Sequence, residues 1–308
     1  MLSFRITTRQ GEMLLPSPIA VVYNSEFSVP ADDVTLEIPY VKGCEDGDFL
    51  LGYENSTLVF KGQIDEIVTL KSSNKITVKI TARSMAGILL DNEAESCIYF
   101  NASSSVIFER HLKPFGFADF EGDNEPYFGY LKISKGMSQW QVFENYCVNK
   151  YGRSPRITGD GRVLLNGISD KEVLCFGKNE GYDYTSAEKK IKRYKVISEV
   201  RLKVVQGNRY GSAIKNSLAD TRLVRRRYVD ALNGGGSVGT ADRIIKKSNE
   251  NAFEVVLTCP YRLMCEVGRK AKLRDETLGS FDGLYVHKLR YTSDSSGEKT
   301  VITLKKEI

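Results

Sequence analysis

The chain has 308 residues, 44 basic and 39 acidic side chains, a formal net charge of +5 and 41% hydrophobic residues. Its apolar runs are too short for a membrane-spanning helix, and the first ten residues lack the apolar stretch of a cleavable secretion signal. The positive charge is weaker than that of a typical nucleic-acid binder, so no specific nucleic-acid binding is expected. Length and composition therefore predict a globular protein of two or three domains.

The first segment, residues 1–94, has the pattern of antiparallel strands. Ile76, Val78 and Ile80 alternate with polar residues, so one face of this strand is expected to be apolar and the other to be exposed to solvent. Turn residues at Glu54–Ser56 and Lys71–Asn74 separate neighbouring strand-like segments. A short helical turn is expected near Asp91. This pattern predicts a first β-barrel or sandwich.

The pattern changes after about Glu95, where helical signals begin. Ser105 is the expected N-cap of a helix that ends near Lys113, and Ser138 is the expected N-cap of a second helix. In the second helix one apolar stripe is expected, and a hairpin with the turn Gly159–Gly161 follows it. Residues 95–176 are therefore predicted to form an α+β insert domain. The stripe consists of Trp140, Phe143, Cys147 and Tyr151.

From residue 177 to residue 308 the chain is predicted to form a second β-barrel, with a further α+β insert at about 207–260. In that insert, a strand is expected over Leu223–Val229, Gly234–Gly236 is expected to be a loop, and Ser237 is expected to cap a helix. A strand over Phe253–Cys259 closes it. The final strands are expected over Lys270–Leu273, Leu284–Tyr291 and Thr300–Lys305.

The two β segments share a sequence pattern. Phe60-x-Gly62 and Phe281-x-Gly283 have the same spacing, and each is followed by a strand, a polar loop and an alternating strand. A phenylalanine would anchor the core, and a glycine would let the strand bend at a barrel corner. A duplicated barrel explains the pattern, and chance similarity between two hairpins is the alternative.

Three neighbouring segments resemble the first barrel of the phage baseplate hub family. They are the string Phe60–Ile67, the alternating strand that ends in Ala82-Arg83-Ser84, and the closing segment at Leu89-Leu90-Asp91. That family includes the phage Mu hub, related siphophage tail-associated proteins and the barrel region of the VgrG spike. The order of barrel, insert and barrel covers nearly the whole chain. The residues that carry the resemblance are Phe60, Gly62, Ile64, Asp65, Arg83, Ser84, Leu89, Asp91, Phe281 and Gly283.

The resemblance implies a mostly β fold with α+β inserts, in which two similar antiparallel β-barrels are separated by small α+β domains. It also implies a structural, non-catalytic homotrimer that joins a six-fold tail tube, or tube-initiator protein, to a three-fold central spike. Baseplate wedge proteins are further partners that it suggests. Such a hub would be assembled in the bacterial cytoplasm and leave in a phage tail or phage-tail-like bacteriocin. No cofactor is implied.

The sequence offers few candidates for catalysis or metal binding. Asp65 and Glu66 are adjacent on a strand, so their side chains are expected on opposite faces, where they cannot act on one bond. His111 and His287 lie on distant segments, and no cysteine pair has metal-ligand spacing. We therefore expect six reduced thiols and no catalytic, metal-binding or cofactor-binding residues.

Two alternatives remain open at this point. The first alternative is a carbohydrate- or oligonucleotide-binding β module. It would use the basic strand Arg225–Arg227, the basic run Lys189–Arg193 and the many tyrosines and phenylalanines. A solvated or protein-binding face explains the same basic residues. A cell-wall hydrolase is the other alternative, and no catalytic pair supports it. Gly234–Gly236 lacks the Gly-Lys-Ser/Thr that a phosphate-binding loop requires.

Overall fold

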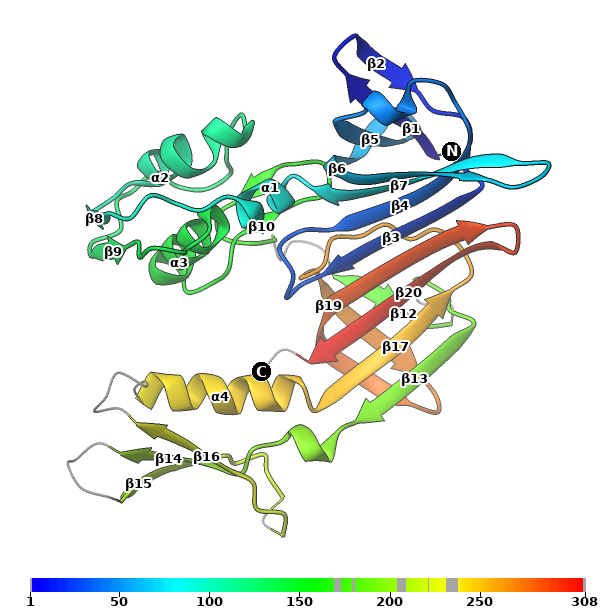
Figure 1. The fold of residues 1–308 in the computed structure, drawn as a ribbon. Coiled ribbons are helices and arrows are strands. Elements are labelled where there is room, and N and C mark those ends of the chain that lie inside the picture. The colour runs from blue at the N-terminus through cyan, green and yellow to red at the C-terminus, as the bar shows by residue number, and fades with distance from the viewer. Residues whose placement is uncertain are drawn as a thin grey trace. The chain divides into compact units, whose positions relative to one another are not determined.

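The structure is a computed structural model that describes residues 2–168, 173–178, 181–203, 209–220, 222–230 and 238–306 (Figure 1). The chain divides into two compact units, and it passes between them several times. Unit 1 contains Met1–Glu172, Pro260–Arg269 and His287–Val301, and unit 2 contains Val173–Cys259, Lys270–Val286 and Ile302–Ile308. The described part is mostly β with large antiparallel sheets and few helices, which confirms the predicted fold class.

Unit 1 is built on an antiparallel sheet whose strands follow the order β19-β3-β4-β7-β6-β5-β1-β2. In β4, Val34, Leu36 and Ile38 are buried, while Thr35 and Glu37 point to the other face. This alternation places the apolar face of the sheet on the core, as expected for a half-buried strand. The strands are β1 (Leu2–Thr8), β2 (Gly11–Leu14), β3 (Ala20–Glu26), β4 (Asp33–Pro39), β5 (Phe49–Glu54), β6 (Thr57–Lys71), β7 (Ile76–Ser84) and β19 (Gly279–Asp294), and β19 belongs to unit 1 from His287 onward.

Both hairpins predicted for this sheet are confirmed. Strands β5 and β6 are joined at Asn55 and Ser56, whose φ angles of 46° and 74° are those of a type I′ turn. Strands β6 and β7 pair from Gly62 to Lys71 and are joined by a polar loop. The short helix α1 (Ala86–Asp91) follows β7, in the expected place.

The helical part of unit 1 contains α2 (Ser104–His111) and α3 (Gln139–Tyr151) (Figure 1). Ser138 caps α3, and Trp140, Phe143 and Cys147 of the predicted stripe are buried. The predicted cap of α2 is wrong. Ser103, not Ser105, accepts the capping hydrogen bond, because Ser103 has the extended backbone that a cap requires. The short strands here are β8 (Ile98–Phe100), β9 (Tyr130–Lys132), β10 (Arg156–Ile157) and β11 (Val163–Leu164).

Unit 2 contains two groups of strands. In one, β13 (Ser186–Ile191) pairs with β17 (Phe253–Cys259), β17 neighbours β20 (Gly297–Lys306), and β18 (Lys270–Asp275) pairs with β12 (Leu174–Phe176) and β19. In β17, Val255, Leu257 and Cys259 are buried, as predicted.

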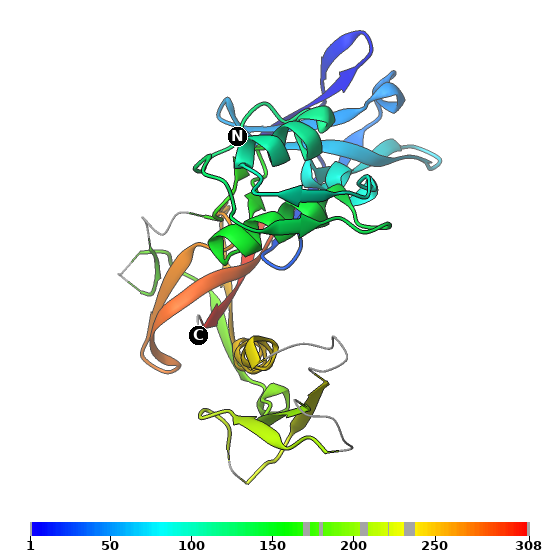
Figure 2. The same cartoon turned by 90° about the vertical axis from the view of Figure 1, so that its left-hand side faces the viewer.

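The other group is a three-stranded sheet of β15 (Ser212–Lys215), β14 (Glu199–Lys203) and β16 (Arg226–Asp230), covered by α4 (Val238–Glu250) (Figure 2). Val200, Leu202 and Ala241 belong to the core between sheet and helix. The strand expected from Leu223 begins at Arg226. The expected loop Gly234–Gly236 and cap Ser237 lie outside the described residues.

Two further expectations concern the whole chain. All six cysteines are free thiols, as predicted. Within the described ranges, no helix combines the length and the apolar character needed to cross a membrane.

Candidate functional site

Three of the predicted family-motif residues meet at one ion-pair cluster in unit 1. The guanidinium of Arg83 donates from Nε and Nη2 to the carboxylate of Asp65, at 2.6 and 3.0 Å. It also donates from Nη1 and Nη2 to Asp91, at 3.1 and 2.6 Å. Hydrogen bonds to Asp65 and then to Asp91 raise the pKa of Arg83, and the bond to Arg83 lowers the pKa of Asp91. The cluster ties β6 and β7 to α1.

Asp65 does not follow the regular alternation that was expected from the sequence. The register of β6 against β7 shifts between Ile64 and Glu66, so Asp65 lies at a β-bulge. The bulge re-aims the carboxylate of Asp65 toward Arg83, while Glu66 remains exposed. The bidentate pair between Asp65 and Arg83 fixes the two strands against each other.

Other motif residues from residues 1–94 lie in the core of unit 1. Phe60 is 2% exposed, and Leu89 is fully buried. A Cβ on Gly62 would lie 2.2 Å from the carbonyl oxygen of Arg83 and 2.7 Å from the ring of Phe60, so only glycine lets the strands approach this closely. Ser84 is buried, and its Oγ accepts a 3.0 Å hydrogen bond from the backbone N–H of Asp32. Ile64 is half-buried.

The second pair of motif residues lies in unit 2 and has different surroundings. Phe281 is half-buried, with its ring centroid 5.1 Å from that of Phe253. Gly283 is exposed, has a φ of 65°, and has no atom within 4 Å of the position of a Cβ. Gly62 is therefore required by close packing, whereas Gly283 is required by its backbone conformation. The equal spacing of the two pairs does not reflect equal local roles.

A buried polar network in unit 1 was not predicted from the sequence. Arg156, from β10, donates at 2.6 Å to Asp32 and at 3.0 Å to the hydroxyl of Ser25. Tyr23 donates at 3.0 Å to the second oxygen of Asp32, and Glu266 lies 3.9 Å from Nε of Arg156. The network connects the sheet, the α+β part and the segment Pro260–Arg269 within one unit.

Burial and charge act against each other in this network. Burial raises the pKa of Glu266 to about 7, although Arg156 opposes the shift. Burial also raises the pKa of Tyr23, and the neighbouring charge of Asp32 adds to it. For Arg156, burial disfavours the charge, but Asp32 and Glu266 outweigh it and raise the pKa. Asp32 accepts hydrogen bonds from Arg156 and Tyr23, whereas Nε of Arg156 and Oε2 of Glu266 are buried without a hydrogen-bond partner among the described residues. The paired charges of Arg156 and Asp32 therefore hold together distant segments of unit 1.

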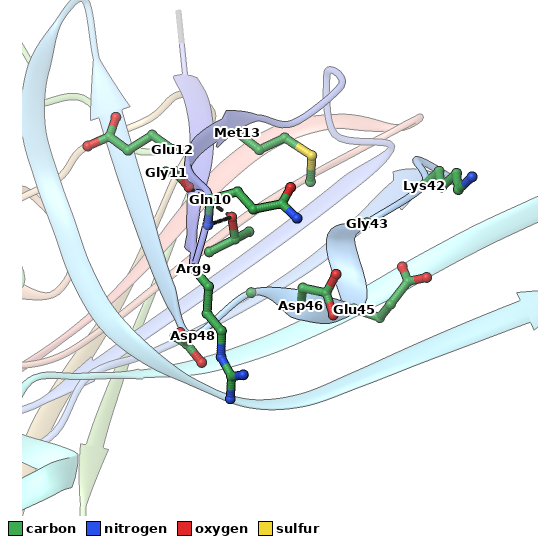
Figure 3. Close-up of a pocket in the computed structure, with 12 residues that line it drawn as sticks. Arg9, Gln10, Gly11, Glu12, Met13, Lys42, Gly43, Glu45, Asp46 and Asp48 are labelled. Carbon is green, nitrogen blue, oxygen red and sulfur yellow. Dashed lines mark hydrogen bonds between the residues drawn. The ribbon is translucent and has the colours of Figure 1, made fainter.

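A hollow on unit 1 lies between the β1–β2 turn and residues 42–48, with a volume of about 800 Å³ (Figure 3). Its lining mixes the cations Arg9 and Lys42 with four carboxylates. In Figure 3 the side chains of Glu12 and Lys42 point away from the middle of the hollow. Within the described ranges, no group of three or more histidine, cysteine or acidic side chains is placed to hold a metal ion. The carboxylates of the lining are Glu12, Glu45, Asp46 and Asp48.

The basic strands are partly balanced by carboxylates. Arg226 donates to Glu199, which lies on the neighbouring strand β14, and Lys190 and Lys192 form ion pairs with Glu254. These pairs reduce the positive charge that a nucleic-acid backbone would require.

The two histidines have different surroundings. His111 is buried, with Nδ1 2.7 Å from Gln139 and Nε2 3.0 Å from the hydroxyl of Tyr99. His287 lies 3.8 Å from Glu26. Both hydrogen-bonding positions of His111 are therefore used inside the fold.

Comparison with known proteins finds similarity only at the level of structure, since no family model and no curated sequence matches the chain. A 43 kDa tail protein of prophage MuSo2 from Shewanella oneidensis has a TM-score of 0.82 at 14% identity, over 100% of this chain and 99% of that one. A tail protein from Neisseria meningitidis has a TM-score of 0.75 at 17% identity, over 99% and 96% of the two chains.

A third solved structure is an E. coli component of the type VI secretion system, described as similar to the T4 bacteriophage tail proteins gp27 and gp5. Its TM-score is 0.59 at 9% identity, over 98% of this chain and 76% of that one. The chain therefore has the fold of these tail proteins along its whole length, and the predicted resemblance is confirmed at the level of the fold.

Proposed function

We propose that this chain is a structural subunit of a phage tail or a phage-tail-like particle, namely a homotrimeric baseplate hub that joins the tail tube to the central spike. The observation that carries the proposal is the structural match to two tail proteins, one of them from a prophage, over 99% or more of this chain. The family-motif residues then serve to hold the first barrel together.

Symmetry supplies the physical reason for a trimer. A tube with six-fold symmetry and a spike with three-fold symmetry cannot share one ring of identical contacts. Three chains with two similar barrels each would present six barrels to the tube and three equivalent sites to the spike. We propose that residues 1–94 and 177–308 supply these barrels, and that 95–176 and about 207–260 are inserts. Assembly would take place in the bacterial cytoplasm, with tube, spike and wedge proteins as partners.

Light scattering on the purified chain tests the proposal. One chain has a mass of 34.6 kDa, so a trimer has three times that mass, about 104 kDa. We expect the trimer at micromolar concentration, alone or with tube and spike proteins added. A chain that remains monomeric in all these mixtures would contradict the hub function.

A further inference from the structure

Unit 2 carries an apolar groove of about 290 Å³ at the end of β13. Ile191, Leu218 and Leu223 line it and are 63%, 65% and 44% exposed. These side chains come from three separate segments: the end of β13, the turn after β15 and the loop before β16. Large apolar side chains gathered at one exposed place mark an interaction surface more often than they mark free surface.

The rim of this groove is positively charged. Arg193 and Arg225 line it, and within the part of the chain that the structure describes neither guanidinium forms an ion pair. The one carboxylate in the lining is Asp220, which accepts hydrogen bonds from Arg222 at 2.9 and 3.1 Å. These bonds lower the pKa of Asp220, and the nearby charge of Arg193 adds to the effect. A partner that enters the groove must therefore bring both an apolar side chain and negative charge. We refer to this surface as the basic groove.

Residues 119–130 of unit 1 offer that combination. Phe128 is 82% exposed and Tyr130 is 67% exposed, and both follow a run of exposed carboxylates. Glu125 forms no ion pair within the described part of the chain, and Glu121 has only a 3.6 Å contact with the exposed Arg162. We refer to this stretch as the acidic aromatic segment. Its exposed carboxylates are Asp119, Glu121, Asp123 and Glu125, of which Asp123 forms an ion pair with Lys150.

The neighbouring strand enlarges the aromatic surface. Phe100 of β8 pairs with Tyr130 of β9 in the ladder, and Phe100 is 74% exposed. Tyr99 and Leu131, which alternate with them, point to the covered face of this two-stranded ribbon, where Leu131 is buried. The outer face is therefore aromatic, and Figure 1 shows β8 and β9 at one end of the helical part of unit 1.

We propose that the acidic aromatic segment of one copy docks into the basic groove of the next copy, with Phe128 as the apolar anchor. This inference rests on the proposed function, because it describes how the copies of the hub contact each other. Burying the ring of Phe128 removes apolar surface from water and so favours association. Arginine and carboxylate groups would form charge-assisted hydrogen bonds around it.

The charges on the two surfaces specify the kind of ring. If two copies met through the same surface, Arg193 and Arg225 would face each other, or the carboxylates of the acidic aromatic segment would, and like charges repel. Contact between the two different surfaces brings opposite charges together. Such a head-to-tail contact is the kind that closes cyclic rings, including a three-membered one. A second copy of this chain is therefore the occupant that fits.

Charge reversal tests the contact directly. Variant A carries Arg193→Glu and Arg225→Glu, variant B carries Glu121→Arg and Glu125→Arg, and variant C carries all four substitutions. The matched control carries Lys246→Glu and Lys247→Glu, which make the same change in net charge as variant A at exposed positions on α4. The oligomer mass is measured by light scattering across a dilution series, and circular dichroism checks that each variant is folded.

We expect variants A and B to dissociate at concentrations at least tenfold higher than the wild-type chain, and variant C and the control to behave like the wild type. Phe128→Ser should weaken association without changing the charge. If the wild type is a trimer and variants A and B dissociate at the same concentration as the wild type, this inference is overturned. The proposed function would then still stand, and the groove would bind another partner. Failure of variant C to recover would also overturn it. A wild-type monomer would overturn both the inference and the proposed function.

Discussion

Arg156 donates a 2.6 Å hydrogen bond to Asp32, and the two side chains are 6% and 0% exposed. The residues are 124 positions apart in the chain, so this pair links two distant segments of unit 1. A buried charge of either sign is costly unless it is paired and hydrogen-bonded. The pair is therefore a point at which removal of one partner should have a large effect on folding.

Arg156→Met should leave the carboxylate of Asp32 buried without its cation. We expect a loss of about 3–5 kcal/mol in the free energy of unfolding, measured with urea. Lys113→Met is the matched control, because Lys113 forms an exposed ion pair with Glu109 and its removal should cost about 0.5 kcal/mol or less. Equal losses for the two variants would show that the buried pair does not stabilise the fold.

Glu266→Gln should change how stability depends on pH. Burial raises the pKa of Glu266 to about 7 in the folded chain, so the folded state binds this proton more strongly than the unfolded state. Its contribution to stability is therefore present at low pH and is lost as pH rises through about 7.

The comparison is the difference in unfolding free energy between the Gln variant and the wild type at pH 5 and at pH 8. Glutamine stays neutral, so the variant should gain stability relative to the wild type as the pH rises. All other titrating groups are common to both proteins and cancel to first order. A difference that is the same at both pH values would mean that Glu266 titrates normally.

Gly62→Ala and Gly283→Ala should differ in cost although the two glycines share a sequence pattern. A methyl group at Gly62 would meet the carbonyl oxygen of Arg83 at 2.2 Å, so we expect a loss of about 3 kcal/mol or more. At Gly283 the space is open and only the φ of 65° opposes alanine, at about 1 kcal/mol. Urea unfolding of both variants measures the two losses. A larger loss for Gly283→Ala would contradict the packing argument.

Many secondary-structure elements could be predicted from the sequence because their signals are local. The alternation of Ile76, Val78 and Ile80 predicts a half-buried strand wherever that strand packs. Ser138 and Gly152 mark the ends of α3 because the capping residues lie next to the backbone groups that they satisfy or release. Ser103 and Ser105 show the limit of such signals, since both residues are serines and only the backbone conformation decides which one is the cap.

The sequence by itself determined the mostly β character of the chain, its main hairpins and the order of its β and helical segments, because strand periodicity, turn residues and caps act over a few positions. Only the tertiary structure decided that Arg156 meets Asp32, that a bulge turns Asp65 toward Arg83, and that Gly62 lies against a backbone carbonyl. Each of these depends on which strand lies beside which, and on their register. No local pattern encodes that register, because it results from packing the whole unit at once.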